Sequence, residues 1–367
     1  MLMVGVLPAV GSGLATMAGT GQLGRLVAHL DWYARRFEVQ YFSYLPLSAE
    51  KPHLVALPSG VTACVQPRWA SPKRALFWPL VDQRAWRGLS VCRAMNLLGA
   101  IPALTAKWAW GIPFVVSHGA DYEAIARIHG RSVLHLCKWR WLRRLVFRSA
   151  SAVLVSRQGL AAQLQYRYPG ARVVHHANWV DLNRFQPGAP SQSRSVLYVG
   201  RLVAEKNLIR LARAVRMLDN TRLRCIGDGP DRSTLEGLGA ECPGPVPWES
   251  LPKEYGRAGV FCLPSYTEGH PKALLEAMAS GLPCAVSDQV GVVQHEETGL
   301  VFKADMEADM RTQIARLLDD PALAAKLGAA ARKDVEQYDI DTVMPQEIAL
   351  LREVATSPVR GRKKSCA

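Results

Sequence analysis

The stretch that decides the fold is residues 264–288, PSYTEGHPKALLEAMASGLPCAVSD. Residues 260–263, directly before it, are an uninterrupted apolar run, which is typical of a strand buried on both faces of a parallel sheet. Pro271 opens a helical pattern that Gly281 closes, and residues 284–287 form the next apolar run. The unit is therefore strand, loop, helix and strand. Its loop lies at the carboxyl end of a strand, where open α/β sheets bind ligands.

Two carboxylates lie eight positions apart in this unit, Glu268 in the loop and Glu276 in the second helical turn. Backbone N–H groups at the start of that helix favour an anion. A carboxylate can accept two hydrogen bonds from a vicinal diol, so the pair suits a ligand with hydroxyl groups on both sides of a phosphate. Two isolated glutamates are also typical of a solvated loop and a helix end, and the spacing alone does not decide between these interpretations.

The whole string, P-S-x-x-E-G-x-P-K-A-L-L-E-A-M-A-x-G-x-P, resembles the signature of family 4 glycosyltransferases. These are retaining enzymes of the GT-B fold that use nucleotide sugars. The resemblance implies an α/β fold with two Rossmann-like doubly wound domains facing a central cleft. It also implies that Glu268 contacts the transferred sugar and that Glu276 holds the nucleotide ribose. The further donor contacts that it implies here are Gly269, His270, Pro271, Lys272 and Leu275.

A second cluster follows an apolar run at residues 196–199, where Arg201 and Lys206 lie at a strand–helix junction. Two cations at such a junction can bind two phosphates from different directions, although exposed loop charges are the commoner explanation. The string G-R-L-x-x-x-K resembles the diphosphate-binding segment of the family, which implies catalytic roles for both residues. Gly227 and Gly229 resemble the family's G-x-G-P turn near the nucleotide.

The N-terminal half begins with a predicted strand at residues 3–8, followed by several glycines. A glycine-rich loop between a strand and a helix lets backbone approach a phosphate closely. The spacing is not that of a dinucleotide-binding fingerprint. It resembles the family's N-terminal glycine loop, with Gly19 and Gly21 as the closer match and the pair Gly11 and Gly13 as the alternative.

His118 ends a predicted buried strand at residues 114–118. A single histidine at such a place is more often structural. The resemblance implies instead that His118 faces the donor sugar, as a histidine at the end of this strand commonly does in the family. Residues 175–185 resemble the family's N-G-V-D-x-x-x-F segment, with Trp179 in place of the usual glycine, which leaves the backbone conformation there open.

The composition, with 49% hydrophobic residues over 367 positions, predicts a globular protein of two domains. The eight cysteines form no C-x-x-C pair and several lie in apolar runs, which is typical of reduced core thiols in the cytosol. The N-terminus lacks a basic region and is interpreted as a strand rather than a signal peptide. No transmembrane helix is predicted.

The net charge of +14 is concentrated in one half of the chain. Residues 1–188 carry 22 Lys and Arg against 7 Asp and Glu, whereas residues 189–367 carry 23 against 24. Such a cationic body predicts an anionic partner, either a membrane surface or a nucleic acid.

Residues 68–87 and 138–148 both mix aromatic rings with cationic side chains. This combination is typical of an interfacial helix on anionic lipid, because the rings enter the headgroup boundary while the charges meet the lipid. The alternative is an ordinary helix with its aromatics in the core and its arginines in water. The predicted membrane and acceptor face comprises Arg140, Arg143, Arg144, Trp139, Trp141, Lys73, Arg74 and Trp78.

We therefore expect a retaining, metal-independent glycosyltransferase that moves a hexose from a nucleotide diphosphate sugar to a lipid-linked or cell-envelope glycan. It would act at the cytoplasmic face of the membrane, in polysaccharide or lipopolysaccharide biosynthesis. The nucleotide sugar is a substrate, a UDP-sugar rather than a GDP-sugar, and no cofactor is expected. The alternatives are another GT-B activity on a soluble acceptor, such as a disaccharide synthase or an epimerase, and a basic nucleic-acid-binding protein.

The predicted domain organisation has an acceptor-binding domain at residues 1–187 and a nucleotide-sugar-binding domain at residues 188–340. A C-terminal helix at residues 341–354 is expected to return to the first domain, as it does in GT-B proteins. Residues 355–367 are predicted to be a disordered basic tail.

Overall fold

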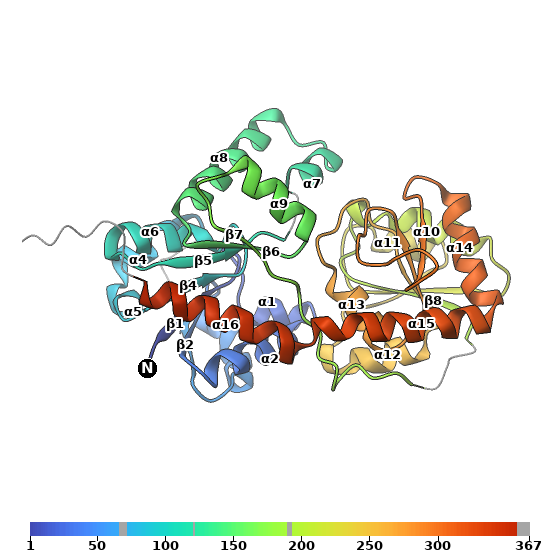
Figure 1. Ribbon diagram of the computed structural model, residues 1–367, viewed down its shortest axis with the longest axis horizontal. Coiled ribbons are helices and arrows are strands. Elements are labelled where there is room, and N and C mark those ends of the chain that lie inside the picture. Colours follow the sequence, from blue (N-terminus) through green and yellow to red (C-terminus); the bar gives the residue numbers. More distant parts are fainter. Residues whose placement is uncertain (66–71, 120–121, 189–192, 358–367) are drawn as a thin grey trace, which may run out of the picture. The chain divides into compact units, whose positions relative to one another are not determined.

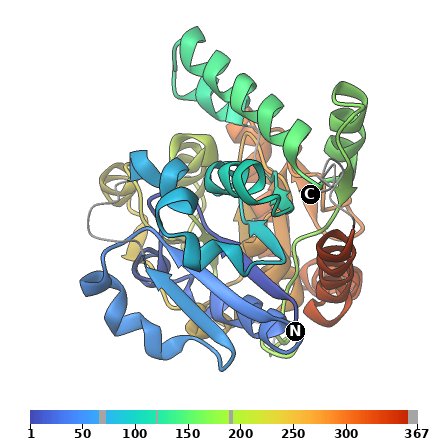
Figure 2. The ribbon, with the colours of Figure 1, turned by 90° about the vertical axis from the view of Figure 1, so that its left-hand side faces the viewer.

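The computed structural model describes residues 1–65, 72–119, 122–188 and 193–357 (Figure 1). The chain divides into two compact units. Unit 1 comprises Met1–Gly119, Lys138–His176 and Met344–Ala367, and unit 2 comprises Ala120–Cys137 and Ala177–Val343. Figure 2 shows the same ribbon turned by 90°.

Unit 1 is built on a parallel sheet with the strand order β3-β2-β1-β4-β5-β6-β7 among its described residues. Most of these strands are short apolar runs, as expected for a sheet with helices on both faces. The strands are β1 (Met3–Leu7), β2 (Glu38–Ser43), β3 (Val61–Val65), β4 (Val91–Ala94), β5 (Phe114–Ser117), β6 (Ala152–Val155) and β7 (Val173–His175).

The chain crosses between these strands through helices, and the last helix of the chain ends in unit 1. The helical elements are α1 (Leu14–Gly19), α2 (Leu23–Ala34), α3 (Leu47–Glu50), η1 (Lys51–Ala56), η2 (Pro72–Phe77), α4 (Trp78–Val81), α5 (Gln83–Arg87), α6 (Ala100–Trp110), α8 (Val133–Ser149), α9 (Gln158–Arg167) and α16 (Ile340–Thr356).

Unit 2 has a second parallel sheet, in the order β10-β9-β8-β11-β12-β13 within the described residues. The first strand in sequence, β8, lies at the centre, and the chain then builds outward on one side and returns to build on the other. The strands are β8 (Ser195–Val199), β9 (Arg222–Ile226), β10 (Glu241–Gly244), β11 (Val260–Leu263), β12 (Cys284–Ser287) and β13 (Leu300–Phe302).

Helices connect most of the strands of unit 2, α7 precedes the first of them, and α14, α15 and η5 follow the last. The helical elements of this unit are α7 (Tyr122–Ile128), η3 (Ala204–Lys206), α10 (Leu208–Arg216), α11 (Arg232–Gly237), η4 (Trp248–Ser250), α12 (Leu251–Arg257), α13 (Lys272–Ala279), α14 (Glu307–Asp319), α15 (Pro321–Val335) and η5 (Glu336–Tyr338). Both units therefore have the doubly wound α/β topology that the sequence predicts. No helix in the described part of the chain combines the length and apolar character needed to span a bilayer.

The boundary between the units differs from the predicted one at residues 187 and 188, because unit 2 begins at Ala177. Phe185 is fully buried and packs against Trp248 and Tyr255, so this segment belongs to the core of unit 2. Unit 2 also includes Ala120–Cys137, although the residues on both sides of that segment belong to unit 1. Helix α16 extends to Thr356, and residues 358–367 of the predicted tail lie outside the described residues.

The prediction that Trp78 lies on a membrane face is wrong, because its side chain is fully buried. Its ring packs edge-on against Phe42 and Tyr44, in the same cluster as Trp86. The short helix α4 packs on α6, which places this aromatic side chain in the core. The side chain of Lys73 lies outside the described part of the chain.

Arg143 is a second correction to the predicted surface, because its side chain is buried. Its Nε donates a hydrogen bond to the hydroxyl of Tyr168 at 3.0 Å. The neighbouring residues Arg140, Arg144 and Trp141 are exposed, as predicted, and Arg74 is exposed as well. Trp139 is half-buried.

Helix α16 is joined to unit 1 by a buried cluster of charges around Glu347. The guanidinium of Arg93 forms an ion pair with Glu347, and the Tyr33 hydroxyl donates to the same carboxylate at 2.8 Å. His176 Nε2 lies 3.0 Å from the other carboxylate oxygen. Burial alone would raise the pKa of Glu347, but the positive charges of Arg93 and His176 hold it well below its usual range.

Replacing Glu347 by alanine should destabilise unit 1 strongly, because Arg93 would be left as a buried charge without its carboxylate. The expected loss in the free energy of unfolding is about 3–5 kcal/mol at neutral pH, measured by urea unfolding followed by circular dichroism. Since the folded-state pKa of Glu347 is lowered, this contribution is lost as the pH falls through that pKa.

Glu353→Ala provides the matched control on the same helix, because Glu353 pairs with Arg172 in an exposed position. Exposed ion pairs contribute little, so this variant should lose much less stability. Equal losses in the two variants would contradict the role that we assign to the buried cluster.

Candidate functional site

The candidate site lies where the strand order of unit 2 reverses, between β8 and β11. Because the two strands are parallel, their carboxyl ends meet at one edge of the sheet. The loops that follow them carry residues 200–207 and 264–271, which hold most of the side chains that the sequence analysis singles out. Ligands of open α/β sheets bind at such a reversal point.

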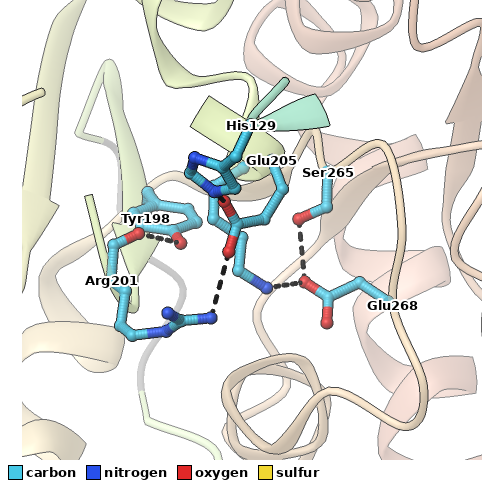
Figure 3. Close-up of polar contacts among 7 residues, drawn as sticks. His129, Tyr198, Arg201, Glu205, Ser265 and Glu268 are labelled. Carbon is cyan, nitrogen blue, oxygen red and sulfur yellow. Dashed lines mark hydrogen bonds and ion pairs between the residues drawn. The ribbon is translucent and has the colours of Figure 1, made fainter. Parts of the chain in front are cut away.

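Lys206 and Glu268, which are 62 positions apart in the sequence, form an ion pair at this edge (Figure 3). The ammonium Nζ of Lys206 lies 2.5 Å from Oε1 of Glu268. The hydroxyl of the buried residue Ser265 donates a second hydrogen bond to the same oxygen, at 2.8 Å. A cation and a carboxylate predicted to bind neighbouring parts of one ligand are thus in direct contact.

Arg201 contacts a carboxylate that the sequence analysis does not single out, that of Glu205. Its Nη2 donates to Glu205 Oε1 at 3.1 Å, and His129 Nε2 lies 2.9 Å from Oε2 (Figure 3). Burial would raise the pKa of Glu205. Hydrogen bonds from its own backbone N–H and from His129, together with the charge of Arg201, lower that pKa below its ordinary value.

Gly227 and Gly229 support the loop that carries Arg201. A Cβ atom on Gly227 would lie 1.9 Å from the carbonyl oxygen of Gly200, and one on Gly229 would lie 2.2 Å from that of Leu202. Both glycines have positive φ angles, 136° and 158°. Only glycine combines this conformation with so close an approach of two backbones. The predicted nucleotide turn therefore packs directly against the strand–helix junction.

Asn207 fixes the end of the same loop in a left-handed conformation, with φ at 57°. Its amide Nδ2 donates to the carbonyl oxygens of Pro264 at 3.2 Å and Ala304 at 2.8 Å. Asparagine adopts this conformation more readily than most residues because its side chain forms local hydrogen bonds. These bonds join the loop after β8 to the loop after β11 and so hold Lys206 beside Glu268.

Glu276 is buried, and both of its carboxylate oxygens accept hydrogen bonds. Trp248 Nε1 donates to Oε1 at 2.8 Å, and the Tyr255 hydroxyl donates to Oε2 at 3.1 Å. Trp248 is itself covered by Phe185 and by the guanidinium of Arg184, which lies 4.3 Å from the ring centroid. These partners fix the orientation of the carboxylate.

The start of helix α13 is held by His270, whose ring and backbone both contact Asn178. The backbone N–H of Asn178 donates to His270 Nδ1 at 3.1 Å, and its amide donates to the His270 carbonyl oxygen. Pro271 precedes the first helical residue, Lys272, as predicted. Gly269 and Lys272 are half-buried, whereas the side chain of Leu275 is fully buried. The donor contacts of these three residues stay predictions.

In unit 1 the two candidate glycine loops have different surroundings. Gly11 and Gly13 directly follow β1, and the backbone N–H groups of Leu14 and Ala15 beyond them donate to the buried carboxylate of Glu50 at 2.8 and 3.1 Å. These two N–H groups are therefore already paired with a carboxylate within the chain. Gly19 is the last residue of α1, and Gly21 lies between α1 and α2.

Gly19 has open space around it, since no atom lies within 4 Å of the position that a Cβ would take, and Gly21 has a positive φ of 70°. Gly11 also has a positive φ, of 89°. Gly19 and Gly21 stay the predicted closer match for approach to a donor, and Gly11 and Gly13 stay the alternative. His118, also in unit 1, is buried at the end of β5, with its ring edge-on to Phe147 at 5.3 Å.

The chain resembles known proteins in both its sequence and its fold. The curated relatives that match parts of the chain include the following three. A sulfoquinovosyl transferase of Arabidopsis thaliana is 33% identical over 42% of this chain and 32% of its own length. A candidate teichuronic acid biosynthesis glycosyltransferase of Bacillus subtilis, TuaC, is 31% identical over 62% of this chain and 61% of its own. A GDP-mannose-dependent alpha-mannosyltransferase of Mycolicibacterium smegmatis is 30% identical over 61% and 63%.

The chain thus spans between about one third and two thirds of the length of these relatives. Solved structures match it more completely. Sucrose-phosphate synthase from Thermosynechococcus elongatus aligns with a TM-score of 0.79 at 18% identity, over 96% of this chain and 99% of its own. HepE from Anabaena in complex with UDP-glucose aligns with a TM-score of 0.74 at 17% identity, over 96% and 100%. The predicted GT-B fold is confirmed.

The matching family is described as Glycosyl transferases group 1, and the match covers residues 180–334. This range contains Arg201, Lys206, Glu268 and Glu276. The part of unit 2 that carries these four side chains is therefore the part of the chain that resembles glycosyltransferases of group 1.

Proposed function

We propose that this chain is a nucleotide-sugar-dependent glycosyltransferase of the retaining family 4 type, with the E-x7-E pair formed by Glu268 and Glu276. The observation that carries the proposal is the contact of Lys206 with Glu268 at the strand reversal of unit 2, within the range that matches the group 1 family. Arg201 lies at the same edge. Cations and a carboxylate at one place suit a ligand with a diphosphate next to a sugar.

In this proposal Arg201 and Lys206 stabilise the negative charge that develops on the departing nucleoside diphosphate. The bond between the anomeric carbon and the phosphate oxygen breaks. The acceptor hydroxyl forms the new bond on the same face of the sugar, and its proton passes to the departing phosphate oxygen. Glu268 contacts the sugar, and His118 is the proposed catalytic residue of unit 1. The proposal includes no metal, and metal independence remains a prediction.

Glu276 is the proposed ribose ligand. Each carboxylate oxygen has two acceptor positions, so ribose hydroxyl groups can donate alongside Trp248 and Tyr255. The orientation of the carboxylate is thus set before the nucleotide binds. A UDP-sugar is our proposed donor, supported by HepE in complex with UDP-glucose. Because one relative is GDP-mannose-dependent, the test includes both nucleotides.

Release of nucleoside diphosphate from a panel of UDP- and GDP-sugars, with and without a lipid acceptor extract, tests the proposed activity. Arg201→Ala and Lys206→Ala should each lower turnover by about two to three orders of magnitude, the scale of losing one preorganised charge in the transition state. Arg213→Ala, an exposed cation on α10, provides the control and should retain wild-type turnover. Near-normal turnover in both site variants would contradict the assignment.

We further propose a lipid-linked acceptor at the cytoplasmic face of an anionic membrane. The supporting observation is the exposed side of α8, where Trp141 is 67% exposed and lies among the exposed cations Arg140, Arg144 and Arg148. On a helix, positions 141, 144 and 148 share one face. A ring surrounded by cations suits the headgroup region, since the ring gains apolar burial while the charges meet anionic lipid.

Vesicle binding tests this surface. Wild-type protein should bind vesicles of phosphatidylglycerol and phosphatidylcholine more tightly as the anionic fraction rises, and less tightly as salt rises. Replacing Arg140, Arg144 and Arg148 by glutamate should detach the protein while leaving the affinity for nucleoside diphosphate unchanged. The same charge reversal at the exposed unit 2 residues Arg213, Arg216 and Arg222 is the control and should have little effect. Binding to DNA in preference to vesicles would contradict the membrane proposal and favour a nucleic-acid partner.

A further inference from the structure

The carboxylate of Glu205 is a buried charge at the candidate site, with only 2% of its side chain exposed. It lies between two side chains from different parts of the sequence, Arg201 and His129 (Figure 3). His129 comes directly after α7, in the segment Ala120–Cys137 that belongs to unit 2. No motif in the sequence points to this histidine.

Each oxygen of this carboxylate has one of the two partners. Oε1 accepts from Arg201 Nη2 at 3.1 Å, and Oε2 faces His129 Nε2 at 2.9 Å. The backbone of Glu205 is held separately, because its carbonyl oxygen accepts from the N–H of Tyr266 at 3.0 Å. Asp231 and Tyr198 are the other titratable groups that interact electrostatically with Glu205. The carboxylate therefore has a fixed position, and its two oxygens have different partners.

Within the described part of the chain, Arg201 is held through one of its terminal nitrogens, while its side chain is 68% exposed. The remaining N–H groups of the guanidinium are available to an anionic ligand, and the contact with Glu205 limits where they can point. An arginine and a carboxylate otherwise tend to form two parallel hydrogen bonds, which would occupy a second nitrogen. In this structure Arg201 contacts the carboxylate through Nη2 on Oε1 alone, and His129 holds the other oxygen, Oε2.

We propose that His129 is a positioning residue for the donor. By holding Oε2, it fixes the orientation of the Glu205 carboxylate so that Arg201 meets it through Oε1 alone, and the rest of the guanidinium is left to the diphosphate. Without the His129 donor, Glu205 takes two hydrogen bonds from Arg201 and draws it away from the ligand. The inference rests on the proposed function, because it takes the anion to be the diphosphate of a nucleotide sugar.

The test is a double-mutant cycle of His129→Leu and Arg201→Ala, read out as the dissociation constant of UDP and of GDP by calorimetry. His129→Leu alone should weaken binding about tenfold, within the usual range for coupled neighbours. In the Arg201→Ala background it should have no further effect, because there is no guanidinium left to restrain. His129→Gln, which keeps a donor near the position of Nε2, should restore affinity to within about threefold of wild type.

Turnover adds a second readout, in which His129→Leu should raise KM for the donor more than it lowers kcat. Arg131→Leu is the control in the same segment, because Arg131 is exposed, and it should match wild type. The glutamine variant keeps the test decisive if the leucine variant does not fold.

If His129→Leu weakened nucleotide binding equally in the wild-type and Arg201→Ala backgrounds, the positioning role would be overturned. Wild-type nucleotide affinity in His129→Leu would also overturn it, as would a failure of His129→Gln to restore affinity. Failure of the proposed function itself would give a different result. The folded wild-type protein would then bind neither UDP nor GDP, and the proposed role of His129 would be wrong as well.

Discussion

The parallel pairing of β8 with β11 is the constraint on which the candidate site depends. Both strands end at the same edge of the sheet, and the strand order reverses between them, so the loops that follow must lie side by side. The contact between Lys206 and Glu268 is a direct result. Asn207 reinforces it through hydrogen bonds to Pro264 and Ala304, which lie after two other strands of the sheet. The geometry of the site is thus a property of the sheet rather than of either loop alone.

Buried carboxylates are the second feature that determines how rigid the site is. A charge removed from water is costly unless hydrogen bonds and opposite charges compensate it. Glu205 and Glu276 in unit 2 both meet this condition with partners on both oxygens. Because these partners come from separate elements, each carboxylate holds several segments in place. In unit 1 Glu347 does the same for α16. Preorganised side chains of this kind bind charged ligands without reorganising first.

Much of the fold could be predicted from the sequence because buried parallel strands are short apolar runs and because glycine and proline mark the helix ends. The runs at residues 196–199, 260–263 and 284–287 all became strands. The resemblance to a family signature also identified the residues that the fold brings together at β8 and β11. The short helices α1 and α7 were not predicted, since one or two turns give too few positions for a periodic pattern.

The errors have a common physical origin, which is that sequence alone does not show which side chains of a helix face the core. Trp78 and Arg143 were predicted to be exposed and are buried, because α4 packs on α6 and because Tyr168 provides a hydrogen-bond partner for Arg143. Glu205 and His129 were missed for a different reason. Their roles arise from contacts between residues 76 positions apart, for which no local pattern exists.

The central claim is that the reversal point of the unit 2 sheet binds the diphosphate of a nucleotide sugar. A crystal structure of the full chain with UDP or GDP, whichever binds more tightly, tests it most directly. We predict that the two phosphates lie within hydrogen-bond distance of Arg201 and Lys206, beside the first turn of α13, with the ribose hydroxyl groups at Glu276. A nucleotide bound elsewhere on the chain, with Lys206 still paired to Glu268, would contradict the account.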